Sequence, residues 1–165
     1  MQANWYHSEQ FNQKKSNLLG RMAIIKAIRG FFDDQDFWEV ETPILQVSPV
    51  MDTHIHAFKT ELKGVDLKVK DTPYLHTSPE FAMKKLMVAG AEKIYQICHV
   101  FRNAEGSKRH VPEFTMIEWY RAQEADYTDI MEDCVGLLRH CAETLDIKEY
   151  SYKEHVCDPF RTGSA

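Results

Sequence analysis

Residues 93–120 read KIYQICHVFRNAEGSKRHVPEFTMIEWY, and this stretch decides how the rest of the chain is interpreted. Side-chain character alternates with a period of two over residues 93–102 and again over residues 114–120, as is typical of β-strands. The polar segment between them has roughly ten residues, whereas an ordinary hairpin closes in about two to five. The stretch therefore predicts a β-hairpin with a loop long enough to contact a ligand.

The same period assigns side chains to faces. Arg102 ends the first expected strand, on the face of Gln96 and Cys98. On the second strand, one face carries Phe114, Met116, Glu118 and Tyr120. An aromatic ring, a carboxylate and a phenol thus share one side, which indicates a binding site.

Four short segments carry a resemblance to a known family. They are FRN at residues 101–103, HVPEFTMIE at 110–118, EWYR at 118–121, and TSPE at 77–80. Together they resemble the class II aminoacyl-tRNA synthetases, lysyl branch, with the hairpin as motif 2. The similarity covers about residues 15–155, and its fixed identities fall in order over more than forty residues.

Within that family, the chain is most similar to the lysyl-synthetase paralogues that attach lysine or β-lysine to translation elongation factor P. The resemblance implies an ATP-dependent ligase that forms an aminoacyl-adenylate, with Mg²⁺ as a cofactor. It also implies a homodimer. Two alternatives stay open: a catalytic fragment of a lysyl-tRNA synthetase with tRNA-Lys as acceptor, and a non-catalytic binding module.

The resemblance assigns roles residue by residue. Arg102 is implied as the catalytic residue, because it matches the arginine that contacts both the substrate carboxylate and the α-phosphate. Implied amino-acid contacts are Ser78, Pro79, Glu80, Glu118 and Tyr120. Implied ATP contacts are Arg102, Asn103, Glu105, His110, Val111 and Phe114. Ala104 stands where the family usually has a glutamate, so the adenine contact would require Glu105.

Elementary chemistry agrees with these roles. A substrate with two amines needs carboxylates at two separated points, because ammonium groups taken out of water need charged partners. Glu80 and Glu118 provide two such groups. An arginine fork suits a carboxylate and a phosphate together. Without the resemblance, Glu80 is equally well explained as complementing a helix dipole, and Phe114 is better explained as a core residue.

Composition restricts the alternatives further. The chain has 165 residues, 44% of them hydrophobic, and a net charge of -5, which argues against a general nucleic-acid binder. Its four cysteines show no CxxC pairing and no apolar N-terminal segment is present, so we expect a cytoplasmic protein that does not enter a membrane. His54 and His56 lack further ligands at zinc spacing, and no metal site is expected from this chain's own residues.

The remaining elements follow from local signals. Residues 1–17 are expected to be a polar lead-in, and residues 18–32 a helix capped by Ser16 or Asn17. A strand is expected at 37–42, closed by Pro43. Because the helix is apolar on two sides, it suits a core or a subunit interface, and residues 18–43 resemble motif 1, the dimer element.

Further along, residues 54–58 predict a strand, and the lysine-rich residues up to 73 predict a surface loop. A short strand at 74–77 should lead into a helix that starts with Ser78 as its cap and ends at about residue 89, before Gly90. A last helix is expected at 127–145, with Cys134 and Cys141 in its apolar core face. Residues 158–165 predict a turn-like tail.

The expected fold is therefore α+β: a class II synthetase-like antiparallel sheet flanked by helices. Residues 18–165 are assigned to one partial catalytic domain, incomplete because only motifs 1 and 2 are found. A glycine-rich motif 3 and the acidic Mg²⁺ ligands of the family do not occur after residue 127. We expect both in a C-terminal half outside this chain.

Overall fold

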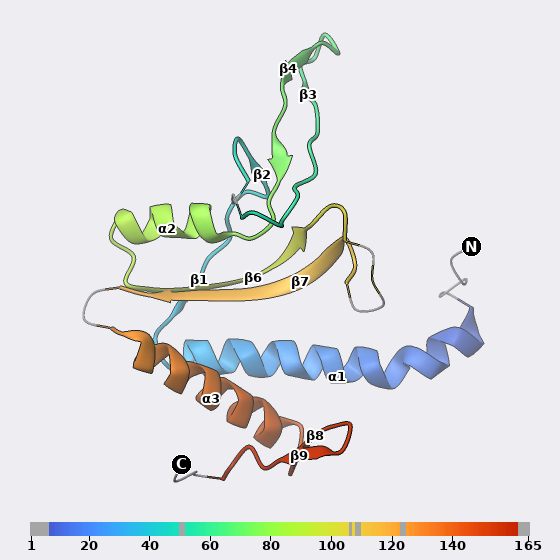
Figure 1. Cartoon of the computed structure of the whole chain (residues 1–165), viewed down its shortest axis with the longest axis vertical. Helices are drawn as coiled ribbons and strands as arrows, with labels where there is room; N and C mark the ends of the chain where they lie inside the picture. Colours follow the sequence, from blue (N-terminus) through green and yellow to red (C-terminus); the bar gives the residue numbers. More distant parts are fainter. Residues whose placement is uncertain (1–6, 50–51, 106, 108–109, 123–124, 162–165) are drawn as a thin grey trace. The chain divides into compact units, whose positions relative to one another are not determined.

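The computed structural model describes residues 7–49, 52–105, 107, 110–122 and 125–161. The chain forms two compact units. The helical unit combines Met1–Gln35 with Ala125–Ala165, and the sheet unit consists of Asp36–Glu124. Helices and short strands are both present, as expected for an α+β protein (Figure 1).

The helical unit contains α1 (Ser8–Asp33), α3 (Tyr127–Thr144) and a terminal hairpin of β8 (Tyr150–Tyr152) with β9 (His155–Cys157). Helix α1 packs against α3. Their approach is close at Gly136, where an added Cβ would meet the ring of Phe31 at 3.0 Å. A larger residue here would require the Phe31 ring to move by a few tenths of an ångström, so glycine permits the close approach of the two helices.

Helix α1 begins ten residues before the predicted position. Its N-cap is His7, without a side-chain cap hydrogen bond, so the predicted caps Ser16 and Asn17 are wrong. Residues 8–17 contain neither glycine nor proline, and their glutamine, glutamate and lysine side chains favour helix, so the helix extends past its apolar part. The lead-in is thus helical from Ser8 on, and its residues 1–6 lie outside the described residues.

The predicted bounds of helix α3 are confirmed: it begins at Tyr127, as predicted, and ends at Thr144, one residue before the predicted end. Asp126 caps its N-terminus and accepts a hydrogen bond from the Thr128 backbone N–H at 2.7 Å. The predicted core position of Cys134 is wrong, because this side chain is exposed while Asp133 is buried. The face of α3 that packs on α1 carries Gly136 and His140. This face is rotated about the helix axis from the predicted one by about one residue, which is roughly 100°.

A three-stranded sheet in the order β1–β6–β7 forms the centre of the sheet unit. Strand β1 (Trp38–Glu39) is parallel to β6 (Lys93–Phe101), which is antiparallel to β7 (Glu113–Arg121). The predicted strand at 37–42 is therefore shorter than expected, although Val40 N–H still donates to the Tyr95 carbonyl at 2.9 Å.

The predicted hairpin is confirmed. Residues of β6 and β7 pair in register from Lys93 with Arg121 to Phe101 with Glu113. Paired residues point to the same face, so Gln96 lies opposite Glu118 and Ile94 opposite Tyr120. Arg102 follows the last strand residue, and its N–H donates to the Pro112 carbonyl at 2.9 Å.

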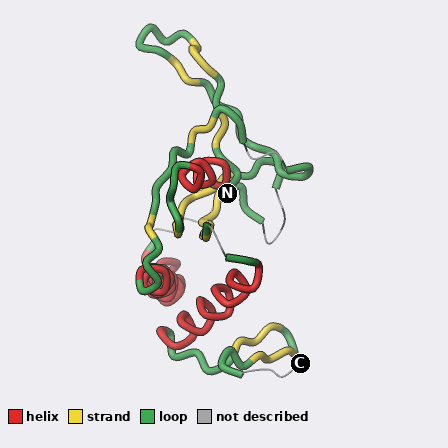
Figure 2. The backbone as a smooth tube through the Cα atoms, turned by 90° about the vertical axis from the view of Figure 1, so that its left-hand side faces the viewer, coloured by secondary structure: helices red, strands yellow, loops and turns green. Residues whose placement is uncertain are grey.

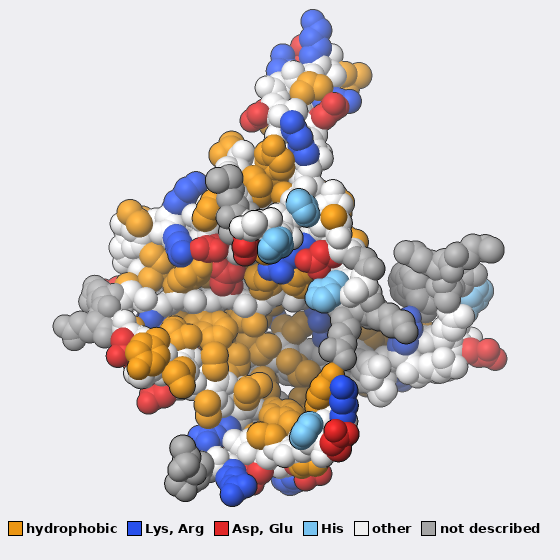
Figure 3. Space-filling model, viewed as in Figure 1, with side chains coloured by type: hydrophobic (Ala, Val, Ile, Leu, Met, Phe, Trp, Pro, Cys, Tyr) orange, Lys and Arg blue, Asp and Glu red, His pale blue; other side chains and the backbone are white. Residues whose placement is uncertain are grey.

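Two small hairpins complete the strands of this unit: β2 (Leu45–Gln46) pairs with β5 (Tyr74–Leu75), and β3 (Leu62–Lys63) with β4 (Val69–Asp71). The predicted loop before residue 73 thus contains a β-hairpin, which Figures 1 and 2 show standing away from the rest of the unit. Figure 3 shows that it carries charges of both signs, and these pair locally as Lys63 with Glu61 and Lys70 with Asp66.

The predicted strand at 54–58 is wrong. His56 makes only an isolated bridge with Asn103, so no continuous ladder forms there. A strand needs a partner along its length, and β6 is already paired on both sides, by β1 and β7.

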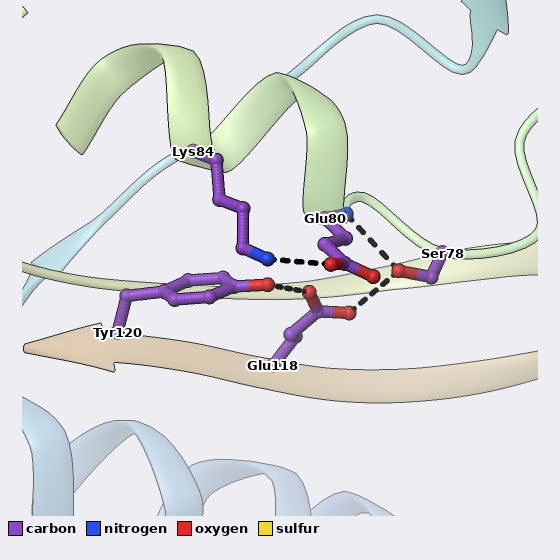
Figure 4. A network of polar contacts seen from close by, with 5 residues as sticks. All are labelled: Ser78, Glu80, Lys84, Glu118 and Tyr120. Atoms are coloured by element: carbon purple, nitrogen blue, oxygen red, sulfur yellow. Dashed lines mark hydrogen bonds and ion pairs between the residues drawn. The ribbon is translucent and has the colours of Figure 1, made fainter. Parts of the chain in front are cut away.

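Helix α2 (Glu80–Val88) follows β5 and begins later than predicted, with Pro79 at the cap position. Ser78 still satisfies the helix start, because its Oγ accepts from the Glu80 N–H at 3.0 Å. The helix ends before Gly90, whose φ of +111° suits glycine. Figure 4 shows α2 over the face of β7 that carries Glu118 and Tyr120.

Among the described residues, no helix is both long enough and apolar enough to cross a membrane.

Met83 tests the packing of α2, because its side chain is fully buried. Met83→Ala should lower the free energy of unfolding by about 2 to 5 kcal/mol, as for other core methionine truncations. Val88→Ala on the same helix is the control; this side chain is 90% exposed and should change the value by less than about 0.5 kcal/mol. Urea unfolding followed by circular dichroism measures both. Equal effects of the two substitutions would show that α2 does not pack through Met83.

Candidate active site

A cavity of about 340 Å³ lies within the sheet unit, between the start of α2 and β7. Its volume is in the range of small-molecule sites, roughly 300 to 1,000 Å³. The residues that line it are Asp52, Ile55, Thr77, Ser78, Glu80, Arg102, Met116, Glu118, Trp119 and Tyr120. Five predicted site residues are therefore brought together: Ser78, Glu80, Arg102, Glu118 and Tyr120.

Glu118 is held from two sides. The Ser78 hydroxyl donates to Glu118 Oε2 at 2.9 Å, and the Tyr120 hydroxyl donates to Oε1 (Figure 4). Ser78 precedes α2, whereas Glu118 and Tyr120 share one face of β7 because they are two residues apart. Both carboxylate oxygens thus have a neutral donor, and the group keeps one orientation.

The Tyr120 phenol stays protonated over the working range of pH. Burial raises its pKa most, and the hydrogen bond to Glu118 and the negative charges of Glu118 and Glu80 raise that pKa further. Because ionisation would place a third negative charge beside two carboxylates, Tyr120 acts as a hydrogen-bond donor.

Glu80 lies at the first position of α2, where the helix dipole favours a negative charge. Its Oε1 accepts from Lys84 Nζ at 2.6 Å, one turn further along the helix. Figure 4 shows this pair next to Glu118 and Tyr120. Two carboxylates therefore face one cavity, which suits a ligand with positive charge.

Arg102 brings a positive charge to the same cavity. Its Nε donates to the Thr77 carbonyl at 3.4 Å, and its guanidinium lies 5.2 Å from the centre of the Phe114 ring. The terminal guanidinium nitrogens have no hydrogen-bond partner among the described residues. An arginine with unused donors beside an aromatic ring fits an anionic group of a ligand.

His76 connects the segments that carry these groups. Its N–H donates to the Ile44 carbonyl at 3.0 Å, and its carbonyl accepts from the Phe101 N–H at 3.0 Å. The ring Nε2 lies 2.7 Å from the His99 carbonyl oxygen, which can only accept, so Nε2 carries the proton. His76 thereby positions Ser78 and Glu80 relative to Arg102, because it precedes Ser78 by two residues and pairs with the residue before Arg102.

The other predicted residues do not line the cavity. Pro79 is buried at the start of α2, and Phe114 contacts Arg102. In the loop, the Asn103 N–H donates to the His56 carbonyl at 2.7 Å, and His110 Nδ1 lies 2.7 Å from Ser107 Oγ. Val111 is exposed, and Glu105 is half-buried outside the cavity lining. Ala104 has a φ of +59°, so the loop turns at this position.

Sequence reasoning assigned no site role to five lining residues: Asp52, Ile55, Thr77, Met116 and Trp119. Thr77 and Met116 are detectable in principle, since one precedes Ser78 and the other shares the Glu118 face. Asp52 and Ile55 come from an irregular segment whose position depends on tertiary contacts, and no sequence period marks them.

Comparison with known proteins now identifies the family. The model of class II tRNA synthetases for aspartate, lysine and asparagine matches residues 2–163. The chain belongs to this family.

Individual relatives are consistent with that assignment. The chain is 40% identical to "Elongation factor P--(R)-beta-lysine ligase" of Pasteurella multocida, over 99% of this chain and 51% of the relative. It is 44% identical to the protein of that name from Haemophilus ducreyi, over 82% of this chain and 41% of the relative. It is 40% identical to the protein of that name from Erwinia tasmaniensis, over 99% of this chain and 50% of the relative. The chain thus spans about half the length of the curated relatives it matches.

Cys98 provides a test of the electrostatics near the site. Burial raises the pKa of its thiol most, a hydrogen bond with Gln96 lowers that pKa, and the negative charge of Glu118 raises it, which together bring it to about 11. At pH 8, the thiolate fraction of Cys98 is therefore about one hundredth of the fraction that a cysteine with the ordinary pKa of 9.0 has. We therefore expect iodoacetamide to label Cys98 far more slowly than the exposed Cys157, with a rate that rises up to about pH 11.

Peptide mass spectrometry over a pH series measures both rates in one sample. Glu118→Gln should speed labelling of Cys98, because it removes a negative charge that raises the pKa. Labelling of Cys98 as fast as that of Cys157 at pH 8 would contradict the half-buried environment of Cys98 near the negative charge of Glu118.

Proposed function

We propose that the full-length protein activates lysine or β-lysine with ATP, through an aminoacyl-adenylate, and transfers the acyl group to a lysine of translation elongation factor P. The observation that carries this proposal is the placement of two carboxylates, Glu80 and Glu118, and one arginine, Arg102, around a single cavity. A molecule with two ammonium groups and one carboxylate matches this set of charges.

In this proposal, Glu118 and Tyr120 bind the side-chain ammonium of the substrate, and Glu80 binds its α- or β-amino group. The hydroxyl donors of Ser78 and Tyr120 support the role of Glu118, because they orient the carboxylate without neutralising its charge. Pro79 contributes indirectly by holding Ser78 and Glu80 at the start of α2.

Arg102 binds the substrate carboxylate and the α-phosphate of ATP. A carboxylate oxygen attacks the α-phosphorus and pyrophosphate leaves, so two anions must approach each other. The guanidinium can contact both anions and the charge that develops on phosphorus, which lowers the barrier. No protein nucleophile is required. The unused donors of Arg102 support this role.

Further ATP contacts are proposed from family membership. Phe114 stacks on adenine, and Asn103, Glu105, His110 and Val111 contribute loop contacts to the nucleotide. The position of the Phe114 ring beside Arg102 supports a shared role at the nucleotide. The Mg²⁺ that accompanies ATP would take its ligands from residues outside this chain.

The names of the relatives support elongation factor P as acceptor, and (R)-β-lysine as one substrate. We further propose that residues 18–165 are part of the catalytic domain and that the protein is a homodimer through residues 18–43. Exposed apolar side chains on α1, including Leu18, Leu19 and Met22, support an interface there.

Glu118→Gln tests recognition of the amino acid. We expect lysine binding to weaken by about 2 kcal/mol, because the side-chain ammonium loses a charged partner that is only partly buried. Isothermal titration calorimetry on the full-length protein gives the value. Glu113→Gln, a change of the same kind at the other end of β7, is the control and should leave the affinity unchanged. An unaltered affinity in Glu118→Gln would remove this residue from the site.

The acceptor is tested directly with both candidates present. The full-length protein is incubated with ATP, labelled lysine or β-lysine, elongation factor P and tRNA-Lys. We expect label in the protein and none in acid-precipitable tRNA. Label in tRNA alone would assign the chain to a lysyl-tRNA synthetase, and no label in either acceptor would favour a binding module.

A further inference from the structure

Lys84 places an ammonium group at the candidate active site. It lies one turn after Glu80 on α2, and its Nζ is 2.6 Å from Glu80 Oε1. Figure 4 shows the Lys84 side chain directed toward the Glu80 carboxylate, in the same view as Glu118 and Tyr120. Neither the family resemblance nor the sequence pattern assigns a role to Lys84.

The two carboxylates are compensated differently. Glu118 accepts hydrogen bonds from two neutral hydroxyls, whereas Glu80 accepts from a cation. Within the part of the chain that the structure describes, Lys84 is the one cation that forms an ion pair with either carboxylate. Lys84 therefore supplies the positively charged side chain that compensates Glu80, in addition to the start of α2.

A lysine ammonium and the amino group of an amino acid have the same charge and the same donors. Both would use the Glu80 oxygens, of which the described residues leave Oε2 without a partner. The Lys84 side chain is 55% exposed and Glu80 is 31% exposed, so the pair can open at low cost.

We propose that Lys84 is an internal competitor: it pairs with Glu80 at the position that the substrate amino group takes on this carboxylate, and substrate binding displaces it. This inference rests on the proposed function, because it requires that Glu80 binds an amine. Lys84 would then act as a specificity-determining residue, since only a ligand with an ammonium at this point gains from displacing it.

Competition by Lys84 implies that loss of its charge strengthens substrate binding rather than weakening it. Removing the Lys84 charge should tighten substrate binding, by about two- to fivefold, which is the range for loss of a partly exposed ion pair. A residue with a merely structural role would leave the affinity unchanged or weaken it. In steady-state kinetics, KM for lysine should fall by the same factor at constant kcat, because the competition affects ground and transition states alike.

The neighbouring Lys85 is a matched control. It has the same charge on the same helix but forms no ion pair with a described carboxylate. Lys84→Met and Lys84→Gln are compared with Lys85→Met in the full-length protein, and thermal unfolding checks that all variants fold. Isothermal titration calorimetry then measures the dissociation constants of three ligands: lysine, norleucine and 6-aminohexanoate.

Norleucine keeps the α-amine and lacks the side-chain amine, whereas 6-aminohexanoate has the reverse. Both Lys84 variants should bind lysine and norleucine two- to fivefold more tightly than the unmodified protein does. Their affinity for 6-aminohexanoate should equal that of the unmodified protein. Lys85→Met should match the unmodified protein for all three. This pattern separates local competition from a general change in charge.

The outcomes distinguish the two proposals. If the unmodified protein binds no lysine, the proposed function is wrong, and the role of Lys84 is lost with it. If it binds lysine but the Lys84 variants bind lysine no better than Lys85→Met does, Lys84 is not a competitor, and the proposed function is unaffected. A gain for 6-aminohexanoate as large as for norleucine would also overturn the assignment of Lys84 to the α-amine position.

Discussion

The antiparallel pairing of β6 with β7 determines where the groups of the candidate active site lie. Nine residues of each strand take part, from Lys93 with Arg121 to Phe101 with Glu113. A slip of one residue would turn Glu118 and Tyr120 to the opposite face, so the register is essential. The same pairing places Arg102 at the end of β6, and His76 joins the segment before α2 to that end. Three separate segments thereby reach one cavity.

Like charges are the main energetic difficulty of that cavity. Glu80 and Glu118 face the same space, and their repulsion has to be offset by donors or cations. Two hydroxyls orient Glu118, the helix start and Lys84 compensate Glu80, and Arg102 balances the charge from another side. A ligand with two ammonium groups would complete this compensation, which links the electrostatics of the cavity to the proposed substrate.

Sequence reasoning predicted the parts of the structure that depend on local periodicity. The hairpin, the face shared by Glu118 and Tyr120, and helix α3 could be predicted because strands repeat every two residues and helices every 3.6. Positions that depend on tertiary contacts could not. The apolar stripe on α1 begins ten residues after the helix itself, which starts at Ser8. The orientation of α3 exposes Cys134, and Asp52 and Ile55 reach the cavity from an irregular segment. The contact of Lys84 with Glu80 follows from ordinary helix spacing, but the role proposed for Lys84 depends on the cavity that Glu80 lines.

A crystal structure of the full-length protein with lysine bound tests the central claim most directly, because it locates both amines and the carboxylate at once. We expect the side-chain ammonium within hydrogen-bond distance of Glu118, the α-amine on Glu80 with Lys84 displaced, and the carboxylate on Arg102. Lysine bound elsewhere, or bound in this cavity with its carboxylate toward α2 and its amines away from Glu80 and Glu118, would contradict the account.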